Sequence, residues 1–315
     1  MQHRLAGRLK LTALLCLAVL LAGCGVAPQG PIDGGPQPIA DPAISAELAP
    51  FYEQEVSWSA CGAERSYCGT IEVPADWNNP QGERFKLAIA YRQADAAKAL
   101  QSKLQAAGGR VECVQADLAQ SADVERMMAH ITQTTGPLDC LVNNASLFEP
   151  DAGDAMDLKG TRQQLEVNLI APLSLASQMA QQAAPDARPG QRSVIHILDQ
   201  KVFNLNPDYF SYTVSKLALE RSVALQAQAL APLRVCGVAP GLMFLSGPQT
   251  QDNFDRASRV NLLREPIDPA QVAATCLFLA QNPCITGTTL CVDNGQHLVP
   301  LERDVMFLAE PKDAA

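Results

Sequence analysis

Short apolar runs alternate with longer amphipathic stretches from about residue 85 onward. The most distinct run, Val194 to Leu198, is apolar except at His196, which is typical of a strand buried on both faces of a parallel sheet. Because strands alternate with helices, the pattern predicts a doubly wound parallel α/β sheet of the Rossmann-like kind. The expected strands are 85–92, 111–114, 138–142, 194–198, 233–238 and 288–292.

Capping residues and polar stretches suggest where several elements begin and end. Ser121 is expected to cap a helix at 121–135. Asp268-Pro269 is expected to begin a helix that runs to Ala280. The polar stretch from 243 to about 259 is expected to be a loop.

Residues 1–84 have a different pattern, which predicts three segments. Residues 1–23 combine a positively charged start with an apolar run too short to span a bilayer, as in an export signal. They end in Leu21-Ala22-Gly23-Cys24, which resembles a bacterial lipobox and implies that Cys24 is lipidated and anchors the chain to a membrane. Residues 24–50, rich in Pro, Gly and Ala, predict a flexible tether, and residues 51–84 predict a small β-hairpin.

Composition excludes several functions for this chain. The formal net charge of −9, a pI near 5.0 and the absence of a basic stripe argue against a nucleic-acid partner. The 4 histidines are far apart and the 10 cysteines are scattered, so neither a metal site nor a disulfide scaffold is expected. His196, inside the expected strand, is interpreted as a core residue with satisfied hydrogen bonds.

Tyr212 and Lys216 stand four residues apart in a helix expected to begin near Tyr209, so their side chains share one face. A phenol has a pKa near ~10 and is a poor acid or base at neutral pH. An ammonium about 4 Å away would favour the phenolate by roughly 4 kcal/mol at an effective dielectric of about 20, or about three pKa units before desolvation opposes it. The pair therefore predicts an acid–base tyrosine. The alternative is a solvated pair on a helix surface.

Three other motifs accompany this pair. Asn143-Asn144-Ala145 ends an apolar strand, Asn168 lies within a later helix, and Pro240-Gly241 follows another strand. Together with Tyr212 and Lys216 they resemble the short-chain dehydrogenase/reductase family over about residues 85–306.

Asp199 stands thirteen residues before Tyr212, where most members of that family have a serine. This substitution, together with Ser146 and Phe148 in the loop after Asn143, resembles the pteridine reductases within the family. The resemblance implies NADPH-dependent reduction of a pteridine or a similar C=N or C=O substrate. It also implies a homo-oligomer.

The resemblance assigns the catalytic roles. Tyr212 would deliver the proton, Lys216 would lower its pKa and hold the nicotinamide ribose, and Asn168 would support a water relay to the lysine. Asp199 suits a pterin because an ionised carboxylate accepts hydrogen bonds that pterin N–H groups donate. The alternative for Asp199 is a residue that caps the loop after the strand.

The binding residues are also assigned by resemblance. Phe148 would stack on the substrate ring, although a simple core aromatic is the alternative. Arg92 would take the 2′-phosphate of NADP and Asp117 would approach the adenine. The full set for the cofactor is Arg92, Asp117, Asn143, Asn144, Ala145, Lys216, Pro240 and Gly241, and for the substrate it is Ser146, Phe148 and Asp199.

The glycine-rich turn that opens this family is missing. Members carry Thr-Gly-x-x-x-Gly-x-Gly between the first strand and a helix, where backbone N–H groups bind the cofactor pyrophosphate. The nearest match, Gly30, Gly34 and Gly35, has no strand before it, and Pro36 and Pro38 block a helix after it. Residues 85–315 are therefore interpreted as a reductase domain without its first strand and phosphate loop, and we expect weak binding of NADP(H).

Residues 51–84 resemble the opening of secreted α/β-hydrolases of the tripeptidyl-aminopeptidase type. No Gly-x-Ser-x-Gly elbow occurs in the sequence, so a hydrolase is disfavoured. Two hypotheses remain: an NADPH-dependent reductase, intact or impaired, and a catalytically inactive lipid-anchored protein. The leader predicts an exported lipoprotein, whereas the reductase portion is of a cytoplasmic kind.

Overall fold

The computed structural model describes residues 59–60, 67–68, 86–92, 94–106, 110–246 and 249–308. The chain divides into two compact units, one ending at Val114 and one that holds the described residues from Gln115 onward. The export signal, Cys24, the tether and most of the 51–84 segment lie outside the described residues. The predictions made for them stay predictions.

The first unit contains two small sheets. In one, β1 (Ser59–Ala60) pairs antiparallel with β2 (Tyr67–Cys68). In the other, β3 (Lys86–Tyr91) pairs with β4 (Arg110–Gln115), and α3 (Ala94–Ala106) connects them along the chain. The strands predicted at 85–92 and 111–114 are confirmed.

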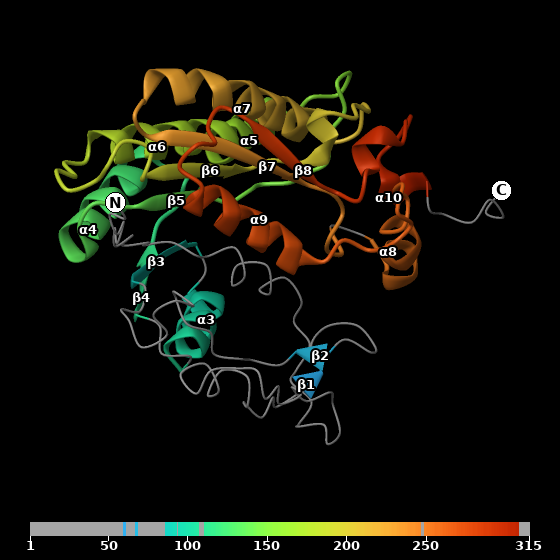
Figure 1. Cartoon of the computed structure of the whole chain (residues 1–315). Coiled ribbons are helices and arrows are strands. Elements are labelled where there is room, and N and C mark those ends of the chain that lie inside the picture. Colours follow the sequence, from blue (N-terminus) through green and yellow to red (C-terminus); the bar gives the residue numbers. More distant parts are fainter. Residues whose placement is uncertain are drawn as a thin grey trace, which may run out of the picture. The chain divides into compact units, whose positions relative to one another are not determined.

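The second unit is built on a four-stranded sheet in which all neighbouring strands are parallel (Figure 1). Every residue of the two central strands is buried, whereas β8 at one edge is only half-buried. This confirms the prediction of a strand covered on both faces and the α/β fold class. The strand order is β5 (Cys140–Asn143), β6 (Ser193–Ile197), β7 (Arg234–Pro240) and β8 (Thr289–Val292).

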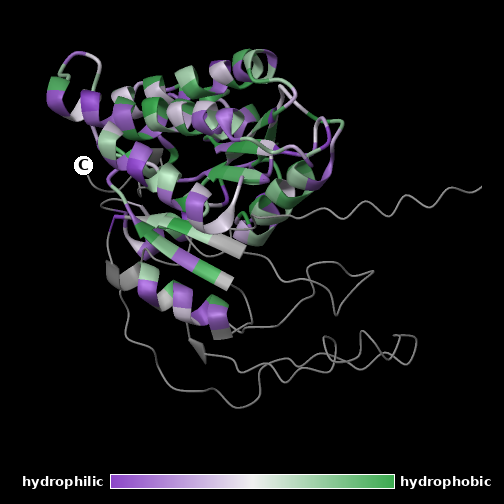
Figure 2. Ribbon diagram, turned by 90° about the vertical axis from the view of Figure 1, so that its left-hand side faces the viewer, coloured by the Kyte–Doolittle hydropathy of each residue, from purple (hydrophilic) through white to green (hydrophobic). Residues whose placement is uncertain are grey.

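Helices cover both faces of this sheet. α7 (Phe210–Ala229) packs against β7, and α9 (Pro269–Gln281) packs against β6 and β7 from the opposite face (Figure 1). α9 directs Val272, Cys276 and Leu279 into the core at helical spacing. In Figure 2 the strands are mostly hydrophobic, whereas the helices mix hydrophilic and hydrophobic residues. The helices between β4 and β6 are α4 (Ser121–Thr135), α5 (Leu158–Leu165), the π-helix η1 (Glu166–Ile170) and α6 (Ala171–Gln181).

Two details of the predicted elements were wrong. Ser121 is the first residue of α4 rather than its cap, since Gln120 holds that position without a side-chain hydrogen bond. The predicted loop at 243–259 contains α8 (Gln251–Ala257), which Thr250 caps by accepting a hydrogen bond from the N–H of Asn253. By contrast, the cap predicted at Asp268 is confirmed, because its carboxylate accepts from the N–H of Ala270 at 2.9 Å.

Three short elements complete the second unit: η2 (Gln200–Val202), η3 (Gln296–Leu298) and α10 (Val305–Leu308). Within the part of the chain that the structure describes, no helix is long and apolar enough to cross a membrane.

Candidate active site

Three of the predicted site residues lie at the carboxyl ends of the strands in the four-stranded sheet. Asn143 ends β5, Asp199 follows β6, and Gly241 follows β7. Because these strands are parallel and in register, their carboxyl ends lie along the same side of the sheet. In open α/β sheets this is where ligands bind.

Asp199 and Tyr212 meet at this side of the sheet. The hydroxyl of Tyr212 donates to Oδ2 of Asp199 at 2.8 Å, while Oδ1 accepts the backbone N–H of Lys201 at 2.8 Å. The second bond caps η2, so the alternative expected for Asp199, a capping residue, is also present. One oxygen shapes the loop and the other faces the tyrosine.

The pKa of Tyr212 does not follow the prediction. Lys216 donates its ammonium to the backbone carbonyl of Ile197 at 2.8 Å, and its Nζ lies 5.8 Å from the centre of the Tyr212 ring. Burial, followed by the charge of Asp199, raises the pKa of Tyr212 well above its usual value. Burial also lowers the pKa of Lys216 to about 8. The expected lysine-stabilised phenolate is therefore replaced by a protonated tyrosine bonded to a carboxylate.

Burial also raises the pKa of Asp199, against the hydrogen bonds from the Lys201 N–H and the Tyr212 hydroxyl. A carboxyl group with a raised pKa holds a proton more readily near neutral pH. Asp199 and Tyr212 are therefore a pair that can share and pass a proton.

Asn168 lies in the π-helix η1, a type of helical turn that often marks functional sites. Its amide is fully engaged: Oδ1 accepts from Ser146 Oγ at 3.3 Å and from Leu147 N at 2.7 Å, and Nδ2 donates to Leu147 O at 2.8 Å and to Ser215 Oγ at 3.0 Å. The side chain thus clamps the loop after β5, and the ammonium of Lys216 bonds Ile197 instead.

Phe148, carried by that loop, lies next to the catalytic pair. Its ring stacks on Tyr209 at 4.0 Å between centroids and meets Tyr212 edge-on at 4.7 Å. The sequence left two alternatives for Phe148, stacking on the substrate ring or a place in the core. The structure puts it in an apolar cluster that contains Tyr212 itself.

Asn143 and His196 form a buried polar link between neighbouring strands. Asn143 donates from Nδ2 toward Nδ1 of His196 at 3.2 Å and toward Pro172 O at 3.4 Å. Nε2 of His196 lies 2.9 Å from Oε1 of Gln226, which only accepts, so the network selects the neutral imidazole with hydrogen on Nε2. Burial lowers the pKa of His196 to about 4. The interpretation of His196 as a satisfied core residue is confirmed, and the Asn143 side chain belongs to the same network.

The remaining predicted cofactor residues occupy turns at strand ends. Pro240 is the buried last residue of β7, and a Cβ on Gly241 would lie 2.6 Å from Ile267 Cδ1 and 3.0 Å from Asp293 Cβ, so only glycine fits there. Asn144 and Ala145 follow β5 in the loop toward Ser146.

Arg92 and Asp117 were predicted to hold the adenosine end of the cofactor. Arg92 is exposed directly after β3, in the first unit. Oδ1 of Asp117 accepts from Ala119 N at 3.0 Å, and its own N–H donates to Asp123 Oδ2 at 3.0 Å. Asp117 therefore also shapes the turn into α4.

Several residues at the site were not indicated by the sequence. Asp151 accepts the N–H of Ser211 at 2.9 Å and also bonds its hydroxyl, which caps the start of α7 at the residue directly before Tyr212. Tyr209, the residue before α7, has a left-handed backbone and caps nothing with its side chain. Lys201 and Asp304 form a buried ion pair at 3.1 Å. These partners are separated by 60 to 103 positions, so no spacing rule connects them.

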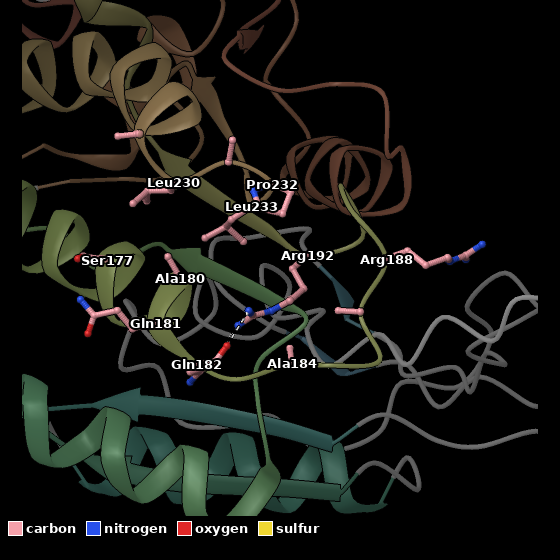
Figure 3. Close-up of a pocket in the computed structure, with 13 residues that line it drawn as sticks. Ser177, Ala180, Gln181, Gln182, Ala184, Arg188, Arg192, Leu230, Pro232 and Leu233 are labelled. Carbon is pink, nitrogen blue, oxygen red and sulfur yellow. Dashed lines mark hydrogen bonds between the residues drawn. The ribbon is translucent and has the colours of Figure 1, made fainter.

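A pocket of roughly 410 Å³ lies near the amino ends of β6 and β7 (Figure 3). It is lined by the end of α6 and by the residues before β6 and β7, among them Gln182, Arg192 and Pro232. Arg192 closes its wall by donating to Gln182 Oε1 at 2.9 Å and to Leu138 O at 2.7 Å. This pocket is separate from the catalytic pair, since it lies at the amino ends of the same strands.

Comparison with known proteins agrees with this geometry. A family model described as enoyl-(acyl carrier protein) reductase matches residues 81–297, which contain the Asp199–Tyr212 pair and Lys216. The chain belongs to the short-chain dehydrogenase/reductase family. This confirms the family resemblance expected from the motifs. The resemblance of residues 1–84 to a hydrolase opening and a lipoprotein leader stays a prediction.

Among solved short-chain dehydrogenase/reductases, the chain is similar to FolM alternative dihydrofolate reductase 1 of Brucella canis, complexed with NADP. The two are 34% identical with a TM-score of 0.65, over 73% of this chain and 88% of that one. The Brucella suis protein, also in complex with NADP, is 35% identical with a TM-score of 0.64, over 68% and 85%. Dihydromonapterin reductase of Escherichia coli O6 is 24% identical over 190 residues, or 59% of this chain and 78% of the relative.

Proposed function

We propose that this chain is an NADPH-dependent reductase of a pteridine or of a similar C=N or C=O substrate. The observation that carries the proposal is the hydrogen bond from Tyr212 to Asp199 at 2.8 Å, with Lys216 buried behind them. The similarity to dihydrofolate and dihydromonapterin reductases supports the substrate class, and the NADP complexes of the Brucella proteins support the cofactor.

The residues around Lys216 fit the nicotinamide end of such a cofactor. An ammonium carries three hydrogens, and Lys216 is 3% exposed with one donated to Ile197 O. The other two are suited to the hydroxyls of a ribose. We assign the cofactor path to Asn144, Ala145 and Gly241. NADPH, when bound, would supply a hydride.

Tyr212 and Asp199 would handle the proton. Tyr212 is protonated over the physiological range because its pKa is raised, so it can donate to a substrate nitrogen or oxygen beside it. Asp199 accepts the N–H groups of a pterin when ionised and can return a proton to Tyr212 when protonated. Phe148 would offer its ring to a flat substrate.

The second candidate is an inactive protein that keeps the fold. The observation that favours it is the absence from the sequence of a Thr-Gly-x-x-x-Gly-x-Gly turn, the part of the family that binds the pyrophosphate. We assign no residue of this chain to that role.

Titration of the full chain with NADPH separates these candidates. A reductase should enhance the nicotinamide fluorescence saturably and should then oxidise NADPH when 7,8-dihydrobiopterin is added. No change in fluorescence and no oxidation of NADPH, even at several millimolar NADPH, would favour the inactive protein. Saturable binding without turnover of any pteridine would show that the cofactor is right and the substrate class is wrong.

A further inference from the structure

Residues 303–307, which we call the C-terminal hook, lie against the loop that follows β6. Arg303 pairs with Asp208 at 2.8 Å, and the N–H of Asp304 donates to the same carboxylate at 2.7 Å. From α8, Asn253 donates its amide to the backbone carbonyl of Met306 at 2.8 Å, and α10 lies beside α8 in Figure 1. The hook is therefore held from two sides.

Met306 is the residue of the hook that joins the apolar cluster around Tyr212. It is 6% exposed and forms an apolar cluster with Tyr209, Tyr212 and Phe148. The hydroxyl of Tyr209 lies 3.5 Å from its sulfur. A thioether next to aromatic rings makes favourable contacts and adapts its shape to a flat group.

Lys201 joins the hook to Asp199. Its backbone N–H donates to Asp199 Oδ1 at 2.8 Å, and its ammonium pairs with Asp304 Oδ2 at 3.1 Å. The Lys201 side chain is 3% exposed, unlike the exposed Arg303. A buried ammonium is costly without a partner, so losing Lys201 or Asp304 leaves the other charge uncompensated. One residue thus couples the catalytic carboxylate to the hook.

We propose that the C-terminal hook is one wall of the substrate site, with Met306 as a specificity-determining residue and the Lys201–Asp304 ion pair as its fastening. The assignment to a pteridine-like ring rests on the proposed function. Met306 and Phe148 both contact Tyr209, and both belong to the apolar cluster that contains Tyr212. Together they would offer an apolar surface to a flat conjugated ring beside the tyrosine.

The fastening is tested on the ligand-free full chain by amide hydrogen exchange of residues 303–308. Lys201→Met keeps the side-chain length and removes the charge, so exchange in the hook should accelerate about tenfold or more. The matched control, Arg303→Met, breaks an exposed pair in the same segment and should change exchange less than about threefold. Equal exchange in the two variants would overturn the fastening role.

The wall is tested by calorimetric titration with 7,8-dihydrobiopterin, with and without NADPH. Met306→Ala should raise the Kd for dihydrobiopterin about tenfold, since losing one apolar contact with a ligand ring typically has an effect of that size. Val305→Ala is the control, because Val305 is also buried in the hook but is not part of the aromatic cluster. Thermal unfolding of both variants checks that each is folded.

The outcomes separate this inference from the proposed function. Wild-type binding that Met306→Ala leaves unchanged would overturn the wall while the proposed function stands. If the wild type binds no dihydrobiopterin, the proposed substrate class is wrong. The hook is then judged by hydrogen exchange alone, in which Lys201→Met must release it and Arg303→Met must not.

Discussion

Tyr212 donates its hydroxyl hydrogen to Asp199 at 2.8 Å, while the ammonium of Lys216 donates to a backbone carbonyl. The proton of the tyrosine is thus oriented by a carboxylate. This relationship makes Tyr212 an acid whose proton is present at neutral pH, rather than a pre-formed phenolate.

Tyr212→Phe should remove the acid and lower the reduction rate that the chain retains by roughly 10² to 10⁴-fold, measured as NADPH oxidation with a dihydropterin at millimolar NADPH. Tyr209→Phe is the matched control, because Tyr209 also packs on Phe148 but its hydroxyl lies against Met306 rather than Asp199. If Tyr209→Phe is the more damaging change, the site has been placed on the wrong tyrosine.

Asp199→Ser should shift the substrate preference. A serine hydroxyl can donate to a carbonyl oxygen, whereas the carboxylate accepts from pterin N–H groups. The ratio of kcat/KM for a dihydropterin to that for a simple quinone should therefore fall. Equal losses on both substrates would mean that Asp199 acts through its cap on η2 alone.

Binding of NADPH by the unmodified chain should be weak. Each helix-terminus charge interaction contributes about 0.3–2 kcal/mol and each charge-assisted backbone hydrogen bond about 1.5–3 kcal/mol, so losing several would move a micromolar site to millimolar or weaker. Replacing residues 1–84 with a strand, a Thr-Gly-x-x-x-Gly-x-Gly turn and its helix should restore binding and Tyr212-dependent reduction. Tight binding by the unmodified chain in a fluorescence titration would contradict this expectation.

His196 should make stability depend on pH. Its pKa is about 4 in the folded protein, below the usual 6.5, so the fold favours the neutral imidazole. This contribution to stability is present in full above pH 6.5 and is lost as the pH falls toward 4. The unfolding free energy should drop by about 2 kcal/mol between about pH 7 and about pH 5 from this residue. His196→Gln can serve the same two partners and does not titrate, so urea unfolding of this variant should show a smaller drop. An unchanged drop would assign the pH dependence to other groups.

Cys24 should carry the lipid if the leader is processed as we propose. Expression in a bacterium, followed by mass spectrometry of the N-terminus, should show a diacylated cysteine and no residues 1–23. Cys24→Ala should abolish this, whereas Cys16→Ala, within the apolar run, should not. An unmodified Met1 in the wild-type protein would contradict processing at Cys24.

Local patterns predicted the fold well where burial dictates the residue type. The run at 194–198 and the Asp268 cap are set by neighbours within a few positions, and both were found as expected. α8 was missed because Gln251–Ala257 is mostly polar, and its stability comes from the Thr250 cap and from contacts with α10. Ser121 fits the residue type of a cap, yet a carboxylate from Asp123 organises that turn instead.

The sequence predicted which residues lie together at the site better than it predicted their hydrogen-bond partners. Tyr212, Asp199 and Phe148 were expected together and lie together, because strand ends and one helix bring them to a shared edge. The actual partner of the tyrosine depends on side-chain directions that the spacing of four residues does not specify. Lys201 and Asp304 are 103 positions apart and were invisible to any local pattern.

The π-helix at Glu166–Ile170 also bears on how the sequence can change. A π turn holds about one residue more than an α turn. The five residues of η1 therefore rotate α6 about the helix axis, relative to the position it would have if α5 continued as an unbroken α-helix. Deleting one residue there would re-phase the helix by roughly 100° and turn Asn168 away from both the Ser146 loop and Ser215. The number of residues in this turn therefore matters as much as their identity, since it sets the direction of the Asn168 side chain.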